Sequence, residues 1–152
     1  MKKGLFPFFI LLAACVLLFG GIFLFKKPAT TSTASFADMT IGDSTYRVEL
    51  ARTDAELEQG LSGRDAIGSD GMLFEFSKNQ YVTFWMKDMR FALDMVWILN
   101  NTIVGIDRNV EPPLNGHDLE VRRSSGLISS VLEVKAGDAK DMFVGENVSV
   151  RY

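Results

Sequence analysis

The sequence predicts a mainly β fold (β-rich α+β), a compact sandwich or barrel-like domain of about eight short strands with one or two short helices. Short runs of alternating apolar and polar residues recur along the chain, separated by Gly, Asn, Asp and Ser. This pattern is typical of half-buried strands joined by tight turns. Cys15 is the only cysteine, so the domain has no internal disulfide and depends on its hydrophobic core.

The first elements expected in the domain are two strands and a helix. Residues 36–41 and 45–51 predict strands, and in the second of them apolar residues alternate with Arg and Glu. Thr53 and Glu56 match a capping box, in which a threonine oxygen and a glutamate three residues later satisfy each other's backbone amides. A helix over residues 54–61 is therefore expected, followed by a loop rich in Gly, Ser and Asp.

Residues 71–99 are expected to form the centre of the fold. Strands are predicted at 72–76 and 81–87, joined by a turn at 77–80. Residues 94–99 are almost continuously apolar, as in a strand buried on both faces. One face of the 81–87 strand is apolar, whereas the other carries aromatic and charged side chains. The second face is therefore the part of this segment that is a candidate binding surface.

The rest of the chain predicts further short strands and turns. An Asn-Asn pair is a tight-turn signal between two strand-like runs, and a loop with two prolines follows the second run. The elements expected in order are a turn at 100–101, a strand at 102–107, a loop at 109–118, a strand at 128–134, one helical turn at 137–141 and a strand at 147–152.

Residues 1–28 are interpreted as an uncleaved signal anchor that forms one transmembrane helix. The apolar run at 5–25 carries no charge and reaches the ~20 residues that a helix needs to cross a bilayer. Two alternatives stay open: a lipoprotein signal ending at Cys15, and a cleaved secretory signal, which normally has a shorter apolar core. Residues 29–35 are small and polar, which predicts a flexible linker. Residues 36–152 are the expected domain.

All three interpretations place the domain outside the cytoplasm, and the favoured one predicts a single-pass protein of the cell membrane. Four of the 16 basic residues and none of the 19 acidic ones precede residue 28, which leaves 12 basic and 19 acidic groups and a net charge of −7. Nucleic acids and anionic lipids both require basic surface, so we expect no nucleic-acid partner. The expected partners are the membrane, through residues 5–25, and a small ligand or an envelope protein.

A series of short motifs resembles one protein family. The motifs, in order, are Gln59-Gly60-Leu61, Ser62-Gly63-Arg64, Gly71-Met72-Leu73-Phe74, Phe84-Trp85-Met86-Lys87, Leu93-Asp94, Leu132-Glu133-Val134 and Ala136-Gly137. Over about residues 46–150 the chain resembles domain-of-unknown-function family 192 of bacteria and archaea. The resemblance implies a small β-rich fold with short helices, often behind an export signal. It implies no particular enzymatic activity or ligand.

The charged residues nearest the apolar centre suggest a candidate binding site. Lys87 shares a strand face with Tyr81 and Trp85, and Asp94 opens a hydrophobic strand. With Arg64 from the preceding loop, these residues are predicted to surround a shallow pocket whose aromatic walls and charges orient a small polar or anionic ligand. The favoured function is therefore a non-enzymatic binding module.

Each charged member of this candidate site also has a structural interpretation. Lys87 at a strand end can extend its ammonium group to water. Asp94 can accept backbone amides in a turn. Arg64 can pair with a neighbouring acid, Asp65 or Asp70. Under these interpretations the residues hold the fold and contact no ligand.

Two other functions stay open. One is a small hydrolase or transferase that uses Asp94 as acid or base together with Lys87 and Arg64. It requires Asp94 to line an open cleft beside a second titratable group. The other is a purely structural module that contacts an envelope partner through an exposed apolar patch. No serine-nucleophile motif is present, and the sequence singles out no catalytic residue.

Metal binding is not favoured, and no cofactor is expected. His117 is the only histidine, so a zinc site of nitrogen and sulfur ligands is excluded, and no Asp-rich calcium loop is present. The methionines at 72, 86, 89 and 95 are soft-metal ligands by type, because thioethers suit Cu(I). Their alternation with Phe and Val favours core filling instead.

Overall fold

The computed structural model describes residues 34–113 and 120–152. These residues belong to a compact unit that spans Thr33–Tyr152. The predicted transmembrane run at 5–25, the Cys15 alternative and all but the end of the predicted linker lie outside the described residues, as does His117. Among the helices of the described part, none combines the length and the apolar character needed to cross a membrane.

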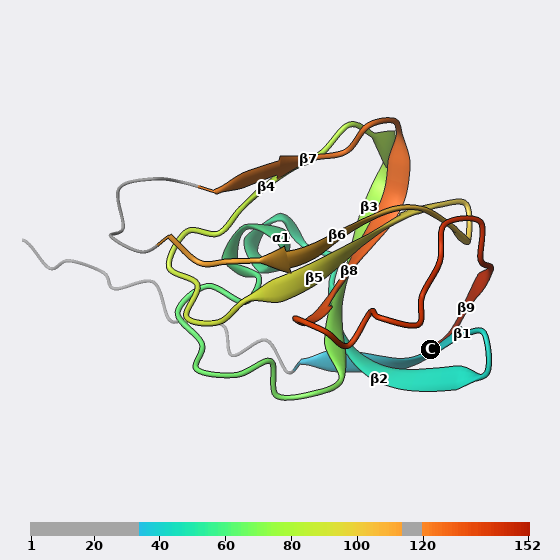
Figure 1. The fold of residues 1–152 in the computed structure, drawn as a ribbon, viewed down its shortest axis with the longest axis horizontal. Helices are drawn as coiled ribbons and strands as arrows, with labels where there is room; N and C mark the ends of the chain where they lie inside the picture. The colour runs from blue at the N-terminus through green and yellow to red at the C-terminus, as the bar shows by residue number, and fades with distance from the viewer. Residues whose placement is uncertain (1–33, 114–119) are drawn as a thin grey trace, which may run out of the picture. The chain divides into compact units, whose positions relative to one another are not determined.

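The described residues form a seven-stranded sheet and a two-stranded ribbon, and the large sheet is strongly curled (Figure 1). Its strand order is β6-β5-β8-β3-β2-β1-β9, and the ribbon pairs β4 with β7. Only the β2–β3 pair is parallel among the described strand pairs. The elements are β1 (Ser35–Ile41), β2 (Ser44–Ala51), α1 (Asp54–Gln59), β3 (Gly71–Gln80), β4 (Thr83–Trp85), β5 (Leu93–Leu99), β6 (Thr102–Val110), β7 (Val121–Arg123), β8 (Ile128–Lys135) and β9 (Val148–Arg151).

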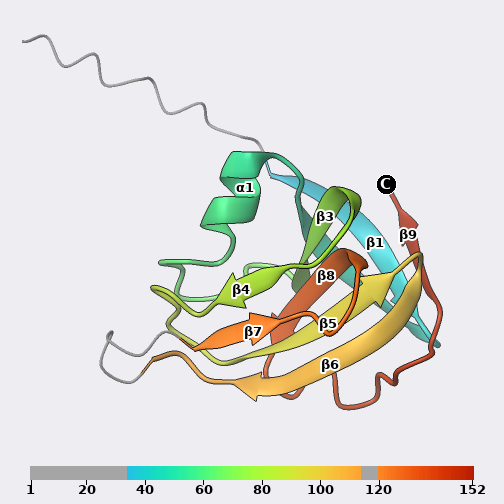
Figure 2. The same ribbon diagram turned by 90° about the horizontal axis from the view of Figure 1, so that it is seen from above.

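Two hydrophobic clusters cover the two faces of the central strands β3, β5 and β8. Leu73, Val96 and Leu132 belong to the first cluster, which also takes in buried residues of β1 and β2. Phe74 and Val131 belong to the second cluster, which packs against partly buried side chains of α1 and β4. Figure 2 shows α1 and the β4–β7 ribbon beside the curled sheet. The central strands are therefore buried on both faces, which explains their nearly continuous apolar sequence.

Local signals placed the first helix and the Asn-Asn turn correctly. Thr53 caps α1 with the predicted capping box to Glu56, and the helix ends at Gly60 with a φ of +46°. Asn100 and Asn101 have φ values of +47° and +66° between β5 and β6. A two-residue hairpin turn requires such positive φ angles, and asparagine tolerates them.

The predicted boundaries around the ribbon are wrong in two places. Residues 77–80, predicted as a turn, continue β3 beyond a register irregularity between Glu75 and Gln80. The strand predicted at 81–87 is only Thr83–Trp85, and it pairs with β7, which was not predicted. Residues 77–80 extend β3 because Gln80 pairs with Ile128 of β8 beyond the irregularity. The β4–β7 ribbon is formed by long-range pairing, which leaves no periodic signal in either short segment.

Candidate functional site

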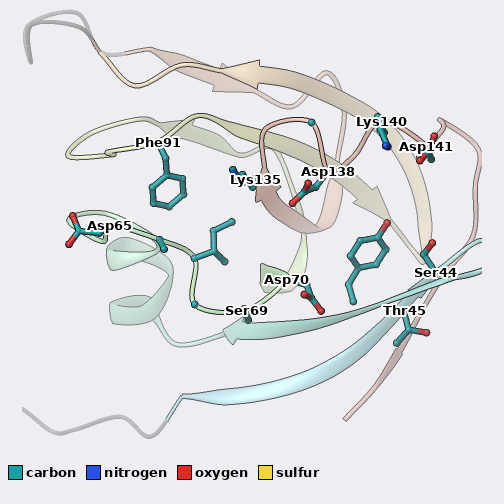
Figure 3. A pocket seen from close by; sticks show the side chains of 15 residues that line it. Ser44, Thr45, Asp65, Ser69, Asp70, Phe91, Lys135, Asp138, Lys140 and Asp141 are labelled. Carbon is teal, nitrogen blue, oxygen red and sulfur yellow. The ribbon is translucent and has the colours of Figure 1, made fainter.

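An open cleft lies between three segments that are far apart in the sequence (Figure 3). They are residues 44–46 at the start of β2, 65–70 in the loop before β3, and 135–141 at the end of β8 and in the turn that follows it. Phe91 completes the lining. The volume of the cleft is about 930 Å³. This size is within the range of small-molecule sites, ~300–1,000 Å³.

The lining of the cleft combines aromatic rings with charges of both signs. Tyr46 and Phe91 supply aromatic surface, and Figure 3 shows Phe91 at one end and Lys140 near the other. Two lysines and four aspartates line the same space, which gives the lining two more negative than positive groups. The charged residues are Lys135, Lys140, Asp65, Asp70, Asp138 and Asp141.

Two of the four aspartates are already occupied by protein groups. The Asp65 carboxylate pairs with the Arg90 guanidinium, and Asp70 Oδ2 accepts the Arg47 backbone N–H at 2.7 Å. The side chains of both lysines and of the two aspartates in the 135–141 segment have no hydrogen bond or ion pair with any described residue. The 135–141 segment therefore supplies the charges that are available to a ligand.

Asp94 lies behind this segment and fixes its backbone. The residue has no exposed surface. Its Oδ1 accepts the Asn109 N–H at 2.8 Å, and its Oδ2 accepts the Gly137 N–H at 2.9 Å and the Ala139 N–H at 3.1 Å. The carboxylate is enclosed and bonded to backbone, as the structural interpretation predicted. The hypothesis that Asp94 acts as acid or base is wrong, because its carboxylate does not line an open cleft.

Arg64 holds the loop that forms the opposite wall. Its two terminal nitrogens donate to the two carboxylate oxygens of Glu49 at 2.7 and 2.8 Å, and Nη1 also contacts the Ile67 carbonyl at 3.4 Å. The hydrogen bond with Glu49 raises the pKa of Arg64, although burial opposes this shift. The predicted partner was a neighbouring acid; the actual partner lies on β2, because the loop folds back across that strand.

The other three predicted site residues are not part of the cleft. Tyr81 is 68% exposed and Trp85 is 53% exposed, and Lys87 is also exposed. Trp85 lines two smaller hollows next to α1 instead. The structure therefore does not gather the five predicted residues into one site: Arg64 and Asp94 support the cleft from behind, and the remaining three lie elsewhere.

Sequence reasoning missed the residues that do line the cleft. The 135–141 segment, which begins with the last residue of β8, combines Lys135, Asp138, Lys140 and Asp141 with the turn residue Gly137. A group of charges at the end of a buried strand is a signal for a site there. The residues that face these charges across the cleft come from distant parts of the chain, so the local sequence does not reveal them.

A buried acid on β8 was also missed. Glu133 is 4% exposed, and burial raises the pKa of its carboxyl from 4.5 to about 8. It has no hydrogen-bond or ion-pair partner within the described residues. The available signal was one acidic residue in an otherwise apolar stretch of the strand, from Val131 to Val134.

Comparison with known proteins places the chain among proteins without an assigned role. Residues 37–152 match the sequence profile of the family DUF192, described as "Uncharacterized ACR". No curated protein matches the chain.

Two solved structures share this fold. One is the crystal structure of a proposed transcription regulator from Sinorhizobium meliloti 1021, with a TM-score of 0.69 and 28% identity, covering 77% of this chain and 95% of the other. The second is a protein of unknown function from Novosphingobium aromaticivorans DSM 12444, with a TM-score of 0.69 and 28% identity, covering 79% of this chain and 89% of the other. Both agree with the mainly β architecture described above.

Proposed function

The chain belongs to DUF192, a family of uncharacterised proteins, and from this premise we propose that it is a non-enzymatic binding module for a small polar ligand. In this proposal residues 5–25 hold the domain at the cell membrane, and the domain works outside the cytoplasm. The observation that carries the proposal is the open cleft of about 930 Å³, whose charges on one wall have no partner within residues 34–113 and 120–152.

Both walls of the cleft are held in place by buried or half-buried charged groups. Asp94 binds the backbone of the 135–141 segment, and Arg64 ties its own loop to Glu49 on β2. Fixing the walls before binding reduces the ordering entropy that a ligand must overcome. This support gives two of the five predicted site residues a positioning role in place of direct contact.

The charges favour a zwitterionic or neutral polar ligand over a simple anion. Lys135 and Lys140 provide donors, whereas Asp138 and Asp141 on the same segment provide acceptors. A simple anion would meet the two lysines but also the surplus of negative charge in the lining. The aromatic rings of Tyr46 and Phe91 suit the apolar face of a sugar ring or of an amino-acid side chain.

A nucleic-acid ligand does not follow from the relative described as a proposed transcription regulator. The part of this chain after residue 28 has 12 basic and 19 acidic groups. Protein surfaces that bind DNA carry clustered positive charge, because phosphate contacts supply most of the non-specific affinity. We therefore propose no role in transcription for this chain.

Thermal unfolding of the full chain in detergent tests the binding proposal. The probes are amino acids, neutral sugars, inorganic phosphate and spermidine at millimolar concentration. We expect an amino acid or a sugar to raise Tm, because a ligand at 100 times its Kd stabilises a protein by ~2.7 kcal/mol. The double variant Lys135→Gln/Asp138→Asn should lose the shift, and the exposed Lys78→Gln control should keep it. If no probe shifts Tm, or if the cleft variant responds like the wild type, the proposed site is wrong.

A separate experiment tests the location. Protease added to intact cells or spheroplasts should digest the domain while the membrane fraction retains the N-terminal segment. Mass spectrometry of the membrane-bound protein distinguishes the two attachments, because a lipoprotein begins at an acylated Cys15 and a transmembrane anchor keeps residues 1–14. Recovery of the wild-type domain in the soluble cytoplasmic fraction would overturn the proposed location.

A further inference from the structure

A cross-strand row of three side chains lies on the face of the sheet that packs against α1 and β4. Glu133 on β8 stands directly opposite Met72 on β3 and directly opposite Met95 on β5. Residues directly opposite each other in antiparallel strands share a face, with Cβ atoms ~4.5–5.5 Å apart. The Glu133 carboxyl is therefore flanked by a methionine on each side.

A small cavity opens beside Glu133. Its lining includes Glu133 together with Met86 and Met89 from the segment that follows β4, and the rest is mostly apolar. The cavity volume is about 30 Å³. A space of this size holds one or two water molecules or one ion, since a single water molecule needs a cavity of at least ~10–15 Å³. An organic ligand is too large for it.

The Glu133 carboxyl lines this cavity without a partner among the described residues. The residue is 4% exposed, and no described residue donates a hydrogen bond to its side chain. Among the described side chains, no fully enclosed polar atom is left without a hydrogen bond, so the carboxyl oxygens keep contact with the cavity space. A nearly buried carboxyl without a partner is energetically unfavourable, and an occupant of the cavity would remove that penalty.

Met89 lies between the cavity and the protein surface, because it lines both the cavity and a second, outer hollow. The outer hollow has a volume of about 450 Å³ and is also lined by Asp88, Arg90 and Ser62. The side chain of Asp88 is exposed, as is that of Glu58, which reaches the inner cavity from α1. The Arg90 guanidinium is paired with Asp65, so Asp88 and Glu58 are the acidic groups beside the cavity. Negative charge near an opening raises the local concentration of cations.

We propose that Glu133, Met86 and Met89 form a binding site for a soft monovalent cation of the Cu(I) and Ag(I) class. Thioethers select soft metals, whereas hard cations prefer sites built from oxygen atoms. Within the described residues no group of three or more His, Cys, Asp or Glu side chains is placed to hold a metal. The thioethers therefore determine which class of metal ion the site would bind. Met72 and Met95 are buried core residues on the same face of the sheet and do not line the cavity. This inference is independent of the ligand proposed for the open cleft.

Metal titration of the full chain in detergent tests this site. Ag(I) serves as a probe without redox chemistry, and Cu(I) is added without oxygen in competition with a chromophoric Cu(I) chelator. All proteins carry Cys15→Ser, so that the thiol cannot bind the metal. The parent protein is expected to bind one equivalent and to show metal–sulfur scattering in X-ray absorption spectra.

Methionine variants separate the site from the core. Met86→Leu/Met89→Leu keeps the side-chain volume nearly unchanged but removes both thioethers, and it should weaken binding at least tenfold. Met39→Leu/Met142→Leu, which changes two buried methionines of the first cluster, should bind like the parent. Glu133→Gln should also weaken binding. Unchanged affinity in the Met86→Leu/Met89→Leu variant, an equal loss in the control, or no binding by the parent would overturn the proposal.

Discussion

Asp94 and Glu133 are both buried carboxyl groups of the same sheet, but their surroundings differ completely. Asp94 has no exposed surface and accepts three backbone N–H groups. Glu133 is 4% exposed, stands between two methionines and accepts none from the described residues. Burial of a charge therefore does not by itself identify a site. The number of partners that the protein already supplies separates a structural carboxylate from a candidate ligand.

The largest expected effect is the pH dependence that Glu133 gives to stability. Burial raises its pKa from 4.5 to about 8, so between these values the folded state holds a proton that the unfolded state has lost. The contribution of Glu133 to the free energy of unfolding is fully present below pH 4.5 and is lost as the pH rises towards 8. The loss amounts to roughly 5 kcal/mol at ~1.4 kcal/mol per pKa unit. Urea unfolding between pH 4 and 9 in metal-free buffer measures it.

The matched control for this prediction is Glu133→Gln, which keeps the shape of the side chain and cannot titrate. The difference in unfolding free energy between variant and wild type should grow in favour of the variant as pH rises. Parallel curves for the two proteins would show that Glu133 keeps an ordinary pKa. Its surroundings would then be wetter than the apolar lining of the small cavity indicates.

The second prediction concerns Asp94, where the protein already supplies every partner. Asp94→Ala leaves three backbone amides without their acceptor, and we expect a loss of about 3–5 kcal/mol in unfolding free energy. Asp94→Asn keeps one acceptor oxygen and should lose less. The exposed Asp138→Ala on the same cleft wall serves as control, with a change within ~0.5 kcal/mol. A loss no larger than that of the control would show that the three hydrogen bonds do not hold the 135–141 segment.

These two carboxyls also show what local sequence could and could not predict. Alternation placed most strands, because a residue's face in a sheet follows from its position along the strand. The residues that decide the role of Asp94 lie 15 to 45 positions away. The partner of Arg64, Glu49, likewise lies 15 positions away, on β2. The candidate site was therefore only partly predictable: two members were recognised as important charges, and their positioning role depends on strand pairing that no local pattern specifies.

The third prediction tests the opposite wall of the cleft. Arg64→Ala breaks the two-pronged contact with Glu49, and we expect a loss of about 1–2 kcal/mol, because the pair is only half buried. Arg151→Ala removes an exposed pair with Asp38 and should cost less than ~0.5 kcal/mol. The ligand-induced Tm shift should also decrease in Arg64→Ala, since the loop is less well fixed. Equal losses of stability in the two variants would contradict a positioning role for Arg64.

The smallest effect is expected at Lys87, a charge that is neither buried nor paired within the described residues. Its backbone carbonyl accepts the Ser62 hydroxyl at 2.9 Å, and this bond survives in Lys87→Ala because it does not involve the side chain. Unfolding free energy should change by less than ~0.5 kcal/mol, and the Tm shift produced by the cleft ligand should be unchanged. Urea unfolding and the thermal-shift assay check both points on the same protein preparation. Loss of the ligand shift without loss of stability would instead support the site predicted from the sequence, in which Lys87 contacts the ligand beside Trp85.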